Sequence, residues 1–198
     1  MGRRTNDPEK NRETILAAAL ECFSAQGYGA TSVQSVADRA NVTKSLVLYH
    51  FPSKEVLWTT TIESHVKPMV ELFLRYANGD PSLSFSDLLK GRFAYLKSHP
   101  HVPRLLSWLS LEAAPFPAPI NEIAPRVLAR AKAEIAASGC SEHPPEMVAA
   151  FALGAVDGWF RYRRLYEHVA GIPEGDPSAD EAFLTTLIDL IPLPEAKS

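Results

Sequence analysis

The segment that decides the fold is Arg12–Leu57, which reads RETILAAALECFSAQGYGATSVQSVADRANVTKSLVLYHFPSKEVL. Apolar residues recur in it at helical spacing in three successive stretches, and only a few residues separate the second stretch from the third. The third stretch opens with small polar and basic side chains, which suit a helix whose tip meets base edges in a DNA major groove. The segment therefore predicts a helix-turn-helix.

The ends of the first two stretches carry recognisable capping residues. Gly27 is expected to end the first helix, which spans about 8–26. Thr31, with Gln34 three residues later, has the pattern of a capping box. We therefore expect the second helix to begin after Thr31 and to reach about residue 40.

The turn and the third helix are also marked by residue type. Asn41 suits the tight turn because asparagine tolerates a left-handed backbone. Thr43 is expected to cap a short third helix that ends at Tyr49, and Ser53 is expected to cap a fourth helix. Val47 would anchor the third helix to the other two.

The remaining two-thirds of the chain keeps helical periodicity and contains no strand pattern, so we predict an all-α protein of about nine helices. The division expected is a helix-turn-helix DNA-binding domain over 1–55 and an effector-binding and dimerisation domain over 56–198. Ser178 and Glu181 have the pattern of a capping box for the last helix. The later helices are expected at about 54–78, 82–98, around 105–111, 120–138, 145–169 and 179–191.

Composition restricts the class of protein. The chain has 198 residues, a net charge of −3 and two cysteines, too few for a disulfide framework. It lacks an apolar run long enough to span a bilayer, and its start lacks the apolar core of a signal peptide, so a cytoplasmic protein without a membrane partner is expected. The six histidines show no metal-ligand spacing, and there is no phosphate loop or nucleophile elbow. We therefore expect no catalytic residues, no metal and no cofactor.

The segment resembles the DNA-binding domain of the tetracycline-repressor (TetR) family over about 45 consecutive residues. Agreement in register at over a dozen positions makes the match specific. Leu48 departs from the family, because many members have a tyrosine there, and Ser45 stands where Gly or Pro is common. The matching positions include Ala18, Ala19, Phe23, Gly27, Tyr28, Thr31, Ala37, Val42, His50, Phe51, Ser53, Lys54 and Glu55.

The resemblance implies that Lys44, Ser45 and Leu46 open the recognition helix and read bases. Their chemistry agrees, since lysine donates to guanine and leucine can touch a thymine methyl group. Alternatively, Leu46 packs inward. A short basic arm at Arg3 and Arg4 either reaches DNA or is an ordinary terminus. The family also places base or phosphate contacts at the positions of Gln34, Thr43, Tyr49, His50 and Lys54. For Tyr49 and His50, a purely structural role within the small domain is the alternative.

Small and aromatic residues in the last two long helices indicate an interface. The family resemblance implies a twofold dimer here, and a short recognition helix needs a second copy to read a palindromic operator. Packing within one chain is the alternative. The interface residues proposed are Gly154, Gly158, Trp159, Tyr162, Phe183 and Leu187.

The resemblance further implies a pocket for a small, largely apolar effector. Polar residues such as His65, Arg92 or Glu112 could orient that effector. The candidate pocket residues are Met69, Phe73, Phe93, Trp108, Leu109 and Phe151, each of which could instead be plain core.

Taken together, these features predict a dimeric transcriptional regulator of TetR type, a repressor released from double-stranded operator DNA by a small molecule. An enzyme and a family member that has lost DNA binding are the competing classes. Lys44, His50 and Lys54 favour retained DNA binding. The sequence names neither the operator nor the effector, and it does not decide between repression and activation.

Overall fold

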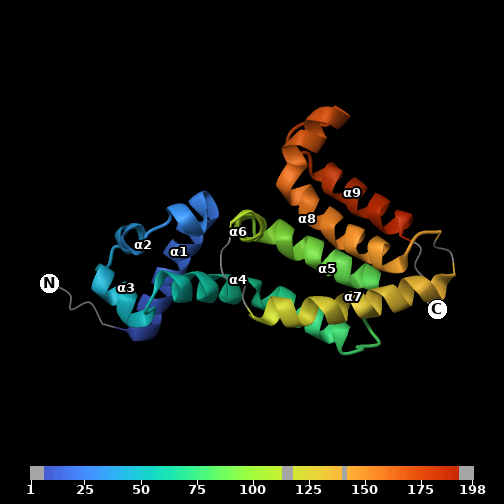
Figure 1. The fold of residues 1–198 in the computed structure, drawn as a ribbon. Coiled ribbons are helices and arrows are strands. Elements are labelled where there is room, and N and C mark those ends of the chain that lie inside the picture. The colour runs from blue at the N-terminus through green and yellow to red at the C-terminus, as the bar shows by residue number, and fades with distance from the viewer. Residues whose placement is uncertain (1–6, 113–117, 140–141, 192–198) are drawn as a thin grey trace. The chain divides into compact units, whose positions relative to one another are not determined.

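The computed structural model describes residues 7–112, 118–139 and 142–191, and these residues contain helices but no strand. The predicted all-α fold is confirmed. None of the described helices is long and apolar enough to cross a membrane. The nine helices that the described residues form are α1 Pro8–Ala30, α2 Val33–Ala40, α3 Lys44–His50, α4 Lys54–Ala77, α5 Phe85–Ser98, α6 His101–Leu111, α7 Ala118–Ser138, α8 Pro145–Ala170 and α9 Pro177–Leu190 (Figure 1).

The described residues fall into two compact units. The first consists of residues 7–67 and 104–112, and the second of residues 68–103, 118–139 and 142–191. The first unit therefore contains α1 to α3, the start of α4 and most of α6. These structural units do not test the predicted functional division into residues 1–55 and 56–198, which stays a prediction.

The core of the first unit is the apolar face that the periodicity predicted. Phe23 of α1 meets Trp58 of α4 edge to face, with ring centroids 5.0 Å apart. Val47 of α3 and Phe51 just after it are buried against this core. Burying side chains of this size stabilises the unit by about 1.5–3 kcal/mol each.

The end of α1 is bent at Gly27, where the backbone has φ 77° and ψ −178°. Regular helix stops there as predicted, but a further turn continues to Ala30. The bend is packed against α6: Trp108 Nε1 donates to the carbonyl of Ser24 at 3.3 Å. Just after α6, Glu112 Oε2 accepts from the Gly29 amide at 3.0 Å.

The capping of α2 corrects the prediction. Thr31 is buried and its hydroxyl donates to the Gly27 carbonyl at 2.7 Å, so it belongs to the bend and does not cap the helix. Ser32 is the N-cap, and it exchanges side-chain and backbone hydrogen bonds with Ser35. Gln34 does not complete a capping box, because its side chain donates to Asp38, one turn later.

The cap of α9 was also predicted wrongly. Asp176 is the N-cap, and its carboxylate accepts from the Ser178 amide at 2.9 Å. Helix α9 therefore starts at Pro177, whose fixed φ suits the first helical position. Ser178 thus lies inside the helix, so it does not form the predicted capping box with Glu181.

Aromatic rings join α5, α8 and α9 in the second unit. Phe93 of α5 lies 4.9 Å from Phe160 of α8 and 6.0 Å from Phe183 of α9, centroid to centroid. Trp159 stacks on Phe183 at 4.6 Å. These three helices therefore share one apolar core.

A buried carboxylate fixes α9 to its neighbours. Asp180 is 3% exposed and accepts from Trp159 Nε1 at 2.9 Å. Lys97 of α5 and Arg163 of α8 each place a nitrogen 2.9 Å from this carboxylate. Burial disfavours the charged form of Asp180, but the hydrogen bonds from Lys97 and Trp159 and the charge of Arg163 outweigh it and lower its pKa.

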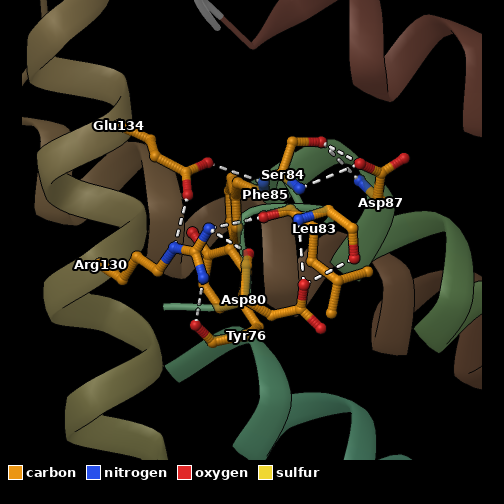
Figure 2. Close-up of polar contacts among 9 residues, drawn as sticks. Tyr76, Asp80, Leu83, Ser84, Phe85, Asp87, Arg130 and Glu134 are labelled. Atoms are coloured by element: carbon orange, nitrogen blue, oxygen red, sulfur yellow. Dashed lines mark hydrogen bonds and ion pairs between the residues drawn. The ribbon is translucent and has the colours of Figure 1, made fainter. Parts of the chain in front are cut away.

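The loop between α4 and α5 is held by Arg130 of α7 (Figure 2). Its guanidinium donates to the carbonyls of Tyr76, Asp80 and Leu83 and pairs with Glu134 at 2.9 Å. Glu134 in turn accepts from the amide of Phe85 at 2.7 Å, at the start of α5. Arg130 and Glu134 together therefore pair with four backbone groups in and beside this loop.

Gly27→Ala should destabilise the first unit. A Cβ at Gly27 would lie 2.7 Å from Glu112 Oε1 and 2.8 Å from the Trp108 ring, in a left-handed backbone. We expect a loss of about 2–4 kcal/mol, measured by chemical denaturation. Gly79→Ala is the control, because Gly79 has φ 86° but nothing within 4 Å of the added methyl group. Equal losses in both variants would mean that the contact with α6 contributes nothing.

Asp180→Asn should destabilise the protein at neutral pH by about 1–3 kcal/mol, because Lys97 and Arg163 lose their carboxylate. The pKa of Asp180 is lowered on folding, so its contribution is present above the unfolded pKa of about 3.9 and is lost as pH falls through the folded value. The stability gap between wild type and variant should therefore close below about pH 4. Denaturation curves at several pH values test this, and a gap that does not change with pH would contradict it.

Candidate nucleic-acid interface

Helices α2 and α3 and the turn between them form the predicted helix-turn-helix. Asn41 adopts the left-handed conformation, with φ 53° and ψ 46°. The amide of Val42 donates to the Ala37 carbonyl at 3.0 Å, which closes the turn. Thr43 caps α3 as predicted, since its hydroxyl oxygen accepts from the Leu46 amide at 3.2 Å.

The two faces of α3 differ sharply in exposure. Val47 is fully buried, whereas Lys44, Ser45 and Tyr49 are exposed, Tyr49 by 77%. The exposed positions lie on one arc of the helix because residues four apart stack on the same face. The arc offers an ammonium group, a hydroxyl group and a phenol, which are donors suited to base edges and phosphates.

Leu46 and His50, four residues apart on α3, lie between this arc and the buried Val47 and are half-buried. The His50 ring is perpendicular to that of Tyr49, with centroids 5.2 Å apart, and lies 6.3 Å from Phe51. These contacts hold the ring beside the exposed face. Leu48, the position that departs from the family pattern, is 38% exposed on the same arc. It is therefore a further surface residue of this face, although it is not among the predicted DNA-contacting residues.

Gln34 and Lys54 differ from the α3 residues because their polar ends already have partners. The exposed Gln34 amide donates to Asp38 at 2.7 Å. Lys54 Nζ donates to the Gly29 carbonyl at 3.1 Å and lies 4.4 Å from the centroid of the Tyr28 ring. A DNA contact by Lys54 would have to share its ammonium with that carbonyl.

Trp108 of α6 and Glu112 just after it support this interface, a role that the sequence did not predict. Both contact the bend of α1 that leads into α2. The sequence separation of more than 80 residues gives no local signal for these contacts. Trp108 had been predicted to line a pocket and Glu112 to orient an effector. Arg3 and Arg4, the predicted basic arm, lie outside the described residues.

The predicted pocket residues are spread over both units. Trp108 and Leu109 belong to the first unit, whereas the other four belong to the second. Met69 and Phe93 are buried and Phe73 is half-buried. Phe151 corrects the prediction of an interior residue, since it is 69% exposed on the single chain.

The predicted interface residues of α8 and α9 also differ in exposure. Gly154 and Tyr162 are exposed, while Trp159 and Leu187 are buried inside the second unit. Gly158 and Phe183 are half-buried. The exposed large apolar residues of α8 recur at helical spacing and are Met147, Phe151, Tyr162, Leu165, Tyr166 and Val169.

The arginines of α8 serve its C-terminal end. Arg163 pairs with the buried Glu167 at 2.7 Å and with Asp180, and Arg164 pairs with Glu174 at 2.8 Å. Both arginines therefore pair with acidic side chains. Among the described residues, no group of three or more His, Cys, Asp and Glu side chains is placed to hold a metal ion.

Comparison with known proteins agrees with this geometry. Residues 15–58 match the family described as bacterial regulatory proteins, tetR family. The HTH-type transcriptional regulator RutR of Escherichia coli (strain K12) is 27% identical over 119 residues, which make up 58% of this chain and 55% of RutR. The match thus spans about half the length of this relative.

Solved structures extend the likeness over nearly the whole chain. The transcriptional regulator SCO4942 from Streptomyces coelicolor has a TM-score of 0.69 at 22% identity, covering 93% of this chain and 99% of that one. A gamma-butyrolactone receptor (ArpA-like protein) has a TM-score of 0.62 at 21% identity, covering 92% and 98%. At these identities the likeness concerns the fold.

Lys44→Ala should reduce discrimination between specific and scrambled DNA by roughly 1–3 kcal/mol if, as the sequence predicts, this exposed lysine at the start of α3 reads a guanine. Fluorescence anisotropy with both DNAs measures the difference. Lys90→Ala removes an exposed lysine of α5 and serves as the charge-matched control. An equal loss on both DNAs would make Lys44 a phosphate contact and contradict base reading.

Proposed function

The chain belongs to the TetR family of transcriptional regulators through its N-terminal helix-turn-helix, and on this premise we propose that it is a homodimeric repressor. In this proposal, residues 1–55 bind one half of a palindromic operator, and residues 56–198 hold the dimer together and bind a small, largely apolar effector. Effector binding releases the operator. The protein acts in the cytoplasm, and it is not an enzyme.

The exposed arc of α3 is the observation that carries the proposal. A buried Val47 and a capping Thr43 fix the orientation of the helix, while Lys44, Ser45 and Tyr49 project to solvent. A helix of 7 residues contacts only a few base pairs, so one copy gives little specificity. Two copies related by a twofold axis would read two half-sites.

The exposed side of α8 supports a dimer. Apolar side chains at helical spacing flank Gly154, beside which an added Cβ would meet nothing within 4 Å on the same chain. A second helix can approach closely where a side chain is missing. An apolar surface of this kind on a single chain marks an interaction site. The second copy of this chain is the occupant that operator symmetry requires.

The effector part of the proposal draws on the family and on the second unit. The gamma-butyrolactone receptor of similar fold is named for a small ligand. The buried aromatic and thioether side chains of α4 and α5 would favour a largely apolar molecule. Such an effector would act by stabilising dimers whose α3 helices do not match successive major grooves.

Gly154→Leu tests the dimer because it separates folding from association. The substitution should raise helix stability by about 0.5–1 kcal/mol, since glycine is the poorer helix former and the added atoms meet open space. Dimerisation, measured by analytical ultracentrifugation, should nevertheless weaken, and affinity for DNA from upstream of its own gene should fall with it. Gly154→Ala, which adds one methyl group, should have a smaller effect.

If the Gly154→Leu variant dimerises as strongly as the wild type, the interface must lie elsewhere. Absence of specific binding to upstream DNA at low salt, where phosphate contacts are strongest, would exclude the regulator itself.

A further inference from the structure

Arg92 of α5 is a cation buried inside the apolar core of the second unit. Only 7% of the residue is exposed. Its guanidinium lies between α4 and α8, and its carbon Cζ is 5.3 Å from the centroid of the Phe73 ring. A charge in such a position requires a full set of partners, because burial without them costs several kcal/mol.

One edge of the guanidinium is fully paired. Nε donates to Asp157 Oδ1 at 3.0 Å, and Nη2 donates to Oδ1 at 2.6 Å and to Oδ2 at 2.7 Å. This two-pronged geometry is the strongest that arginine and a carboxylate can form. Asp157 is about one-third exposed, so the pair reaches toward the surface on the α8 side.

The other edge is poorly paired. Nη1 donates to the thioether sulfur of Met69 at 3.0 Å, and thioethers are weak acceptors. Buried donors in proteins are normally paired with oxygen. The acceptor of Arg92 Nη1 is therefore a sulfur atom, and an oxygen atom in its place would form a stronger hydrogen bond.

Charge balance restricts what could satisfy this edge. Asp157 already neutralises Arg92, so a second carboxylate would add an uncompensated negative charge to an apolar site. An uncharged oxygen acceptor, such as a carbonyl group, would complete the hydrogen bonding without that cost. The neighbouring Met69, Phe73 and Phe93 favour an apolar body for the same molecule.

We propose that Arg92 selects the effector, and that this effector is an uncharged, largely apolar molecule whose carbonyl oxygen replaces Met69 Sδ as the acceptor of Arg92 Nη1. The Met69 side chain can move away from Arg92 when the effector binds, because it is unbranched and flexible. Asp157 is a positioning residue that orients the guanidinium. This inference rests on the proposed function only in assuming that the second unit binds an effector.

Three probes of similar size test the chemistry: acetophenone has a carbonyl group, ethylbenzene has none, and benzoate carries a negative charge. Binding to the full chain without DNA is measured by ligand-detected NMR titration. Acetophenone should bind roughly three- to tenfold more tightly than ethylbenzene, as expected for one added hydrogen bond to a charged donor, and benzoate should bind most weakly.

Two variants assign the preference to Arg92. Arg92→Met combined with Asp157→Leu replaces the ion pair by apolar residues, a change that buried pairs often tolerate, and should make acetophenone and ethylbenzene equal. Met69→Leu keeps the volume but removes the competing sulfur, so the preference for acetophenone should increase. A purely structural role of Arg92 would not produce this increase.

The inference is overturned if benzoate binds best, if the double variant keeps the ketone preference, or if acetophenone does not bind in the millimolar range. Circular dichroism confirms that each variant is folded. Operator binding is measured separately with the same samples. Specific DNA binding without any ketone preference would refute the inference alone, whereas loss of specific DNA binding in the wild type would refute the proposed function.

Discussion

The left-handed backbone at Gly27 is the constraint on which the DNA-binding half depends. It bends the end of α1, and the residues around the bend are held by three side chains from elsewhere in the first unit. Trp108 donates to the Ser24 carbonyl before Gly27, and Glu112 and Lys54 bind the backbone of Gly29 after it. Helix α2 begins directly after this bend. The contacts that set the direction of α2 and α3 relative to α1 therefore involve none of the α3 residues that we propose to contact DNA.

The second unit is organised by buried ionic groups as much as by apolar packing. Arg92 joins α5 to α8, and Asp180 joins α9 to both of them. The pairs with α5 join helices that are distant in the sequence. Buried pairs of this kind add little net stability compared with apolar residues, but breaking one partner is costly. They therefore favour one arrangement of these helices over others that would bury similar apolar area.

Features set by neighbouring residues could be predicted from the sequence, and features set by distant ones could not. Helical periodicity gave the helices and the buried Val47, and the Asn41 turn and Thr43 cap follow from local chemistry. The Thr31 cap was wrong because the Thr31 hydroxyl donates to the Gly27 carbonyl, in a bend that packs against the distant residues Trp108 and Glu112. The exposure of Phe151 and the burial of Trp159 depend on which side of α8 meets α5 and α9, and composition alone does not specify that side.

Arg130 has a consequence for how the second unit opens. Its single guanidinium collects carbonyl groups from Tyr76, Asp80 and Leu83, and its partner Glu134 holds the first amide of α5. Separation from α7 would remove the partners of all these backbone groups at once. We therefore expect the end of α4, the loop and the start of α5 to open together when they separate locally from α7.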